Sequence, residues 1–136
     1  MRISTLVLVL SALVSSGAAA AAEPLSEEET IFVIVTLGRV IVPAKCDGYG
    51  YEIIENGLLK FGDATGVDAP RFLRATIAAA AAIGGGEYNR EDLIPEVTRA
   101  VIKIADEMHE EITSSTKSFC KKWGEMLIEK KVAKRK

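Results

Sequence analysis

The chain has 136 residues, with 17 Lys and Arg against 19 Asp and Glu, and a formal net charge of −2. This balance lacks the excess of positive charge that nucleic-acid-binding domains carry, so nucleic acid is not an expected partner. The length is that of one domain with a modest hydrophobic core.

Residues 1–22 have the composition of an export signal. Arg2 supplies a positive charge, residues 3–14 are apolar apart from Ser and Thr, and residues 18–22 are all alanine. A signal peptidase cuts after such small residues, and the apolar stretch is shorter than the roughly 20 residues of a transmembrane helix. We predict a signal peptide at residues 1–22. The mature chain, residues 23–136, should form a single periplasmic or secreted helical domain with no transmembrane segment.

The first helix of this domain is expected to contain residues 31–42. Ser26 and Glu29 have the spacing of a capping box, in which two side chains satisfy free amide groups at a helix start. The many β-branched residues would also suit a buried strand, and periodicity alone does not decide between the two. The length of the segment and the capping box favour a helix. It should end before Pro43, because the residue ahead of a proline disfavours helical geometry.

Two further helices are expected in the middle of the chain. Apolar residues recur on one helical face over residues 51–65, and Gly66 suits a left-handed helix stop. Asp68 can cap the next helix, with Pro70 in its first turn. The glycine run at residues 84–86 ends that helix.

The clearest helical pattern follows Pro95, where apolar residues repeat every three or four positions up to Ile112. Residues 113–116, Thr-Ser-Ser-Thr, interrupt it with side chains that prefer caps and turns. The pattern resumes at Phe119, so we expect either one bent helix or two helices in near register. Together these elements predict an all-α fold, a small bundle of four to five helices.

Cys46 and Cys120 are the only cysteines in the chain. Because the cysteines of exported proteins usually pair, we expect one disulfide that closes the bundle. Tyr49, Tyr51 and Trp123 lie close to these cysteines in the sequence. They are expected either to rim the core around the disulfide or to line a cleft for a ligand or partner.

Basic residues concentrate at the C-terminal end. Residues 117–136 contain eight Lys and Arg, against Glu125 and Glu129 alone. Cations at a helix C-terminus complement its macrodipole, so residues 130–136 are expected to be a frayed helix end that adds little to the core. The alternative is weak contact of this basic end with anionic surfaces.

The sequence offers no complete set of catalytic or metal-binding residues. His109 is the only histidine, whereas di-iron carboxylate bundles need an acid-x-x-His pair on each of two helices. Ser114, Ser115 and Ser118 lack the sharp glycine-flanked turn of a nucleophile elbow. The glycines at 84–86 lack the Gly-Lys of a phosphate-binding loop. We therefore expect no enzymatic activity, no metal and no cofactor.

The general plan resembles that of the acid-stress chaperones of the bacterial periplasm. A signal peptide, a small helical domain closed by one disulfide, and a basic C-terminal end carry this resemblance, which is one of architecture and transfers no site residue. It implies a protein that unfolds at low pH and exposes the apolar residues 31–42.

The leading functional hypothesis is a non-enzymatic exported protein that acts by contact with another protein or with the envelope surface. A conditional periplasmic chaperone is the alternative. The second alternative is a small-ligand-binding module with a cleft near Tyr49, Tyr51 and Trp123.

Overall fold

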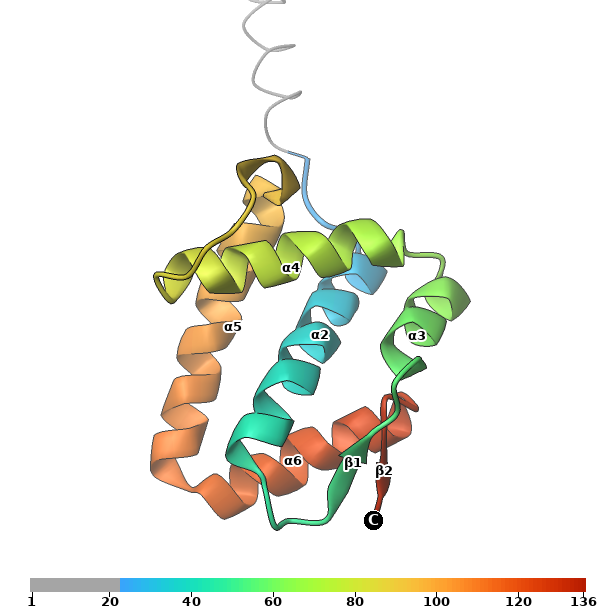
Figure 1. The fold of residues 1–136 in the computed structure, drawn as a ribbon, viewed down its shortest axis with the longest axis vertical. Helices are drawn as coiled ribbons and strands as arrows, with labels where there is room; N and C mark the ends of the chain where they lie inside the picture. The colour runs from blue at the N-terminus through green and yellow to red at the C-terminus, as the bar shows by residue number, and fades with distance from the viewer. Residues whose placement is uncertain (1–22) are drawn as a thin grey trace, which may run out of the picture.

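A computed structural model describes residues 23–136, so the predicted signal peptide at residues 1–22 lies outside the described residues. This part of the chain contains five α-helices and two short strands (Figure 1). Their bounds are α2 (Glu27–Lys45), β1 (Tyr51–Ile53), α3 (Gly57–Thr65), α4 (Ala69–Ile83), α5 (Pro95–Ser114), α6 (Thr116–Glu129) and β2 (Ala133–Arg135). A 3₁₀ turn, Arg90–Asp92, precedes α5. The predicted all-α class and the small bundle are confirmed.

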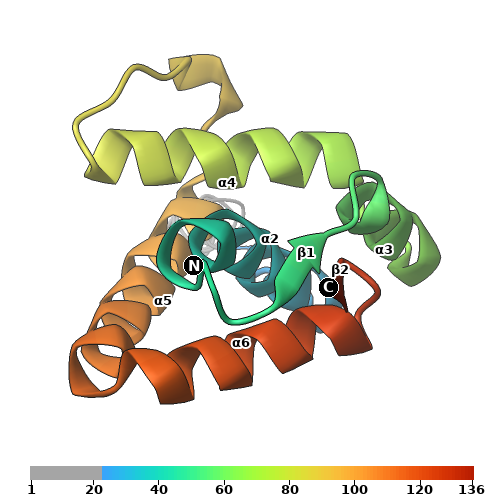
Figure 2. The same cartoon turned by 60° about the horizontal axis from the view of Figure 1, so that its bottom comes forward.

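Helix α2 lies in the middle of the bundle. Helices α3, α4, α5 and α6 all pack against it, with α4 and α6 on opposite sides (Figures 1 and 2). Its buried residues fall on nearly every side of the helix: Phe32, Val33, Val35, Thr36, Leu37, Gly38 and Val42. A helix that is apolar all round is a buried helix, which explains why residues 31–42 show no clean amphipathic pattern.

The predicted start of α2 is correct, and its predicted end is not. At the start, the capping box forms as predicted, since Ser26 Oγ accepts from the Glu29 amide and Glu29 Oε1 accepts from the Ser26 amide. The prediction that the helix ends before Pro43 is wrong, because α2 continues to Lys45. Pro43 costs the helix one hydrogen bond. The last turn stays helical because Val42 is buried and because the Cys46 amide donates a hydrogen bond to the Val42 carbonyl.

The start of the second predicted helix is also wrong. Residues Tyr51–Ile53 form strand β1, and helix α3 begins only at Gly57. The partner of β1 is the antiparallel strand β2, in which Ala133 lies opposite Ile53. Because this partner comes from the far end of the chain, no local pattern near residue 51 could indicate a strand.

The C-terminal end is not a frayed helix end, and that expectation is also wrong. The side chains of Val132 and Ala133 are 0% and 2% exposed. The Ile54 amide donates to the Val132 carbonyl at 2.9 Å, and the Lys136 amide donates to the Gly50 carbonyl at 2.9 Å. The basic end therefore contributes apolar side chains to the core while its charged side chains point outward.

The remaining helix ends lie where the sequence places them. Gly66 has φ 77° at the end of α3, Asp68 accepts from the Arg71 amide at the start of α4, and Pro95 lies in the first turn of α5. Ser115 ends α5 and caps α6, with its Oγ accepting from the Ser118 amide. The interruption at residues 113–116 thus separates two helices.

The predicted disulfide between Cys46 and Cys120 is present, with the two Cα atoms 5.5 Å apart. It ties the end of α2 to α6 inside the core, since both cysteines are buried.

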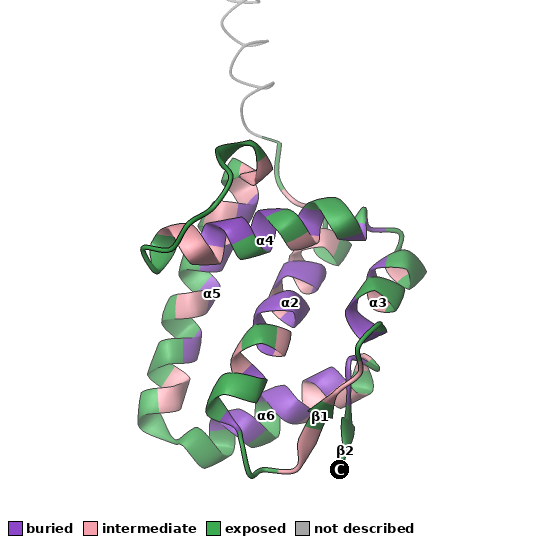
Figure 3. Cartoon of the chain, in the orientation of Figure 1, coloured by how far each residue is buried: buried purple, intermediate pink, exposed green. Residues whose placement is uncertain are grey.

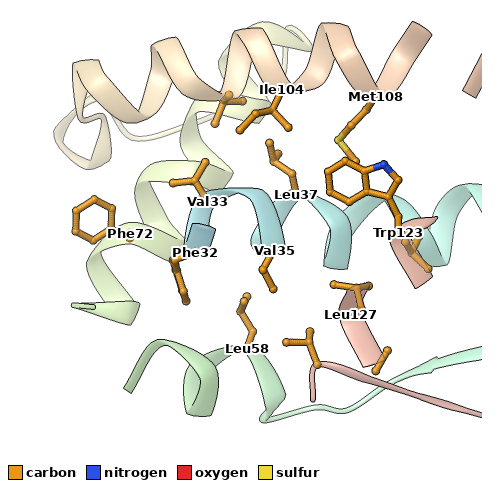
Figure 4. Packing of buried hydrophobic residues seen from close by; sticks show 14 of the residues in the cluster. Phe32, Val33, Val35, Leu37, Leu58, Phe72, Ile104, Met108, Trp123 and Leu127 are labelled. Atoms are coloured by element: carbon orange, nitrogen blue, oxygen red, sulfur yellow. The ribbon is translucent and has the colours of Figure 1, made fainter. Parts of the chain in front are cut away.

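The buried side chains form one cluster along α2 and the inner faces of its neighbours (Figures 3 and 4). The rings of Phe32 and Phe61 stack with centroids 6.5 Å apart, which joins α2 to α3. Phe119 and Trp123 form a tilted pair at 5.8 Å on α6. Among residues 23–136, no helix combines the length and the apolar composition needed to cross a bilayer.

Reduction of the disulfide should lower the free energy of unfolding by about 2–4.5 kcal/mol, because the cross-link restricts a loop of about 75 residues in the unfolded chain. Urea unfolding with and without reductant measures this loss. A C46S/C120S variant is the matched control and should show the same loss, now insensitive to reductant. Equal midpoints for the oxidised and reduced protein would contradict the prediction.

Val132→Ala should lower the free energy of unfolding by about 2 kcal/mol, because it removes two buried methyl groups from a packed position. Lys134→Ala, two residues further along in β2, is the control, since Lys134 is exposed. It should change stability by less than about 0.5 kcal/mol. Thermal or urea unfolding of both variants would settle the matter, and a Val132→Ala protein as stable as the parent would restore the frayed-end interpretation.

Candidate functional site

Two adjoining hollows lie where α5 meets α6. The outer one has a volume of about 560 Å³ and is lined by Glu107, Glu110, Glu111, Ser114, Ser115, Ser118, Phe119 and Lys122. The inner one has a volume of about 250 Å³ and is lined by Ile34, Ile104, Glu107, Glu111, Lys122, Trp123 and Met126. Because Glu107, Glu111 and Lys122 line both hollows, we describe the two together as the α5–α6 groove.

The chain turn at Ser115 creates this groove. Since Ser115 has extended backbone geometry between two helices, α5 and α6 leave it in different directions and their facing sides diverge (Figure 2). The Thr116 hydroxyl donates to the Ile112 carbonyl at 3.3 Å, and this hydrogen bond spans the turn in addition to the Ser115 cap. Local capping therefore fixes the angle between the two walls.

Glu111 links the two walls through a three-residue cluster. Its Oε1 and Oε2 accept from Lys122 Nζ at 3.0 and 3.1 Å, and Oε2 also accepts from the Trp123 indole N–H at 3.2 Å. Lys122 Nζ lies 5.9 Å from the centroid of the Trp123 ring. The indole is thus held in place by a hydrogen bond at its polar end and by a cation near its face.

The floor of the inner hollow is apolar because α2 comes close to α6 at this point. A Cβ on Gly38 would lie 3.0 Å from Trp123 Cε3 and 3.3 Å from Met126 Cε, so a larger residue would require these side chains to shift by a few tenths of an ångström. In Figure 4 the indole lies beside Met108 and Leu37. Trp123 is 7% exposed and forms part of the floor.

The rim of the groove carries a net negative charge. Three carboxylates, Glu107, Glu110 and Glu111, surround it, and Lys122 is the one cation among the lining residues. An apolar floor with a carboxylate rim is suited to a ligand that combines an apolar group with positive charge.

Of the three aromatic residues singled out in the sequence, Trp123 alone belongs to this groove. The Tyr51 ring lies against Gly124, and its hydroxyl donates to Glu125 Oε1 at 3.5 Å. Tyr49 is 44% exposed in the turn after α2. The three residues thus have different neighbours, and Tyr51 and Trp123 contact different parts of the bundle.

Tyr51 also takes part in closing the β1–β2 pair. Arg135 forms an ion pair with Glu125, the acceptor of the Tyr51 hydroxyl. Burial raises the pKa of the Tyr51 phenol, and the nearby negative charge of Glu125 raises it further. These contacts give Tyr51 a structural role at the edge of the core.

Only some of the residues considered for catalysis line the groove. Ser114, Ser115 and Ser118 line the outer hollow, but His109 is not among its lining residues, and the Ser115 hydroxyl is engaged as a helix cap. Within residues 23–136, no three His, Cys, Asp or Glu side chains are grouped closely enough to hold a metal ion.

The sequence did not indicate the role of Glu111. It lies in a run of acidic residues that suits a solvated helix face, and its partners follow on the next helix. The available signal was the polar interruption at residues 113–116, because a sharp turn there brings residues on either side of it together.

Comparison with protein-family models, with curated proteins and with solved structures finds no match to this chain.

Glu111→Ala should lower the free energy of unfolding by about 1–2 kcal/mol, because it leaves the half-enclosed indole N–H without its acceptor. The emission of Trp123, the only tryptophan, should also shift to longer wavelength as water reaches the ring. Glu110→Ala, an exposed neighbour on the same wall, is the control and should leave both readings unchanged. An unchanged emission maximum in Glu111→Ala would show that the carboxylate does not position the indole.

Proposed function

We propose that this is a small exported, non-enzymatic protein that binds a protein partner through the α5–α6 groove. The observation that carries the proposal is the combination of an apolar floor with a rim of three carboxylates at one concave site. The partner segment would carry positive charge and at least one aromatic or branched aliphatic side chain.

The geometry of the groove supports this choice of partner. The inner hollow, about 250 Å³, has room for one apolar side chain rather than for a large ligand. Glu107 and Glu110 are exposed at the rim, so a basic residue that follows the apolar anchor can reach a carboxylate. Rim charges of this kind steer association and select partners more than they add affinity.

The disulfide supports export. Disulfides persist in oxidising compartments, such as the bacterial periplasm and the extracellular space, and are rare in the cytosol. The apolar residues 3–14 and the alanines at 18–22 suit a signal peptide. Export to the periplasm or beyond, and the removal of residues 1–22, therefore belong to the proposal.

A conditional chaperone is the alternative within the same class. The apolar surface that it would use, residues 31–42, lies mainly inside the bundle, so client binding would require α2 to be uncovered. The two functions differ in specificity. A chaperone suppresses the aggregation of unrelated clients, whereas the groove selects a partner by its charge and its apolar anchor.

The test compares retention of envelope proteins by three forms of the tagged, oxidised protein. E107K/E110K reverses two rim charges, and E87K/E91K makes the same charge change at exposed positions in the loop before α5. We expect a protein that is retained by the parent and by E87K/E91K, and is reduced about tenfold or more with E107K/E110K. Calorimetry with that purified protein should show binding that weakens as salt is added.

Equal retention of every protein by E107K/E110K and E87K/E91K would contradict the use of the groove. Suppression of the aggregation of several unrelated clients at acid pH, unaffected by E107K/E110K, would favour the conditional chaperone instead.

A further inference from the structure

A further hollow lies at the C-terminal end of α6, away from the α5–α6 groove, and its lining is positively charged. It has a volume of about 580 Å³ and is lined by residues of α3 and of the turn between α6 and β2. In Figure 1, α3 lies beside the end of α6 and the start of β2. Its lining includes Ile54, Phe61, Ala64, Lys60, Lys130 and Lys131. We call it the α3 hollow.

The wall of the α3 hollow is apolar. Ile54, Phe61 and Ala64 contribute it from the α3 side. Phe61 is fixed from behind by stacking on Phe32, so its outward face is a firm surface. The chain turn is also firm, because Gly57 packs against the backbone of Lys131 and Val132, where a Cβ would lie 2.5 Å from the Lys131 carbonyl oxygen.

The charge at this hollow is positive and largely unneutralised. Lys130 Nζ lies 5.9 Å from the centroid of the Phe61 ring and 3.9 Å from Glu129, the one carboxylate among the lining residues. Within residues 23–136, Lys60 and Lys131 form no ion pair.

The other basic residues of the chain end differ in this respect. Arg135 is paired with Glu125, and Lys134 lies opposite Glu52 across the two strands. The lining of the α3 hollow thus has three lysines against one carboxylate, a net positive charge.

We propose that the α3 hollow binds a single-chain amphiphile with an anionic head, of the long-chain carboxylate type. The acyl chain lies along Phe61, Ile54 and Ala64, and the carboxylate lies between Lys60, Lys130 and Lys131. This site is separate from the α5–α6 groove, and neither proposal depends on the other.

The shape of the site favours a free amphiphile over a bilayer surface. The apolar wall lies inside a concave site whose volume is within the range of small-molecule pockets, about 300–1,000 Å³. A flat membrane would meet the exposed lysines but would not reach the wall between α3 and the chain turn. Only a ligand with both an apolar chain and an anionic head can contact the apolar wall and the lysines at the same time.

The test is titration of the oxidised protein with dodecanoate below its critical micelle concentration, followed by calorimetry and by amide chemical shifts. We expect saturable binding, with shifts at the amides of Gly57, Lys60, Thr65 and Lys131. Acetate, which has the head alone, and dodecyltrimethylammonium, which has the opposite charge, should bind at least about tenfold more weakly.

Two variants separate the site from general charge effects. K60Q/K131N removes two charges from the hollow, and asparagine tolerates the φ of 62° at residue 131. Its affinity for dodecanoate should fall about tenfold, whereas K103Q/K121Q, with the same charge change at exposed positions elsewhere, should bind like the parent. Ala64→Glu should block the site while Lys60 and Lys131 are kept.

Equal dodecanoate affinity for K60Q/K131N and K103Q/K121Q would overturn the proposal. Equally tight binding of dodecyltrimethylammonium would overturn the role of the lysines. Binding to vesicles of anionic phospholipid with no binding of dodecanoate would also overturn it, and would assign the basic end to the membrane surface.

Discussion

The structure depends on the burial of α2 on nearly every side. A helix that is apolar all round is stable in water only if neighbours cover it completely, and here every other helix of the described chain takes a share of that cover. The disulfide then fixes the end of α2 to α6, the helix that also forms a wall of the α5–α6 groove. The position of the groove is thus a consequence of how the chain covers its first helix.

The local elements were largely predictable, because their signals are local. The capping box at Ser26, the stops at Gly66 and at residues 84–86, and the break at residues 113–116 are all present in the structure. What the sequence could not indicate depends on partners far away in the chain. Tyr51 fits the apolar face of a helix equally well, and only pairing with residues near Arg135 makes it part of a strand. Val132 and Ala133 are two apolar residues in a basic tail, yet both are buried in the core.

The same reasoning applies to the two candidate sites. Each lies at a junction, between α5 and α6 in one case and between α3 and the start of β2 in the other. Trp123 stands out in the sequence as a large amphipathic residue. Its hydrogen bond to Glu111 could not be predicted, because it depends on the angle at which the turn at Ser115 joins α5 and α6. The acidic rim near the start of α6 comes from the carboxylates of α5, whereas the lysines at its other end come from α3 and from the turn that follows α6.

The position of α6 has a consequence for the order in which the molecule is built. Chains emerge N-terminus first, so α2 is present as an uncovered apolar segment well before α6, its last covering helix, arrives. Leu127 of α6 packs next to Gly38 of α2, and at typical synthesis rates of about 5–20 residues per second the roughly 85 residues between Val42 and Leu127 correspond to roughly 4–17 s. During that interval the nascent chain exposes the apolar side chains of α2, whether at the ribosome or in a translocation channel. The fold is therefore suited to a route on which the polypeptide is held unfolded until nearly all of it has been delivered.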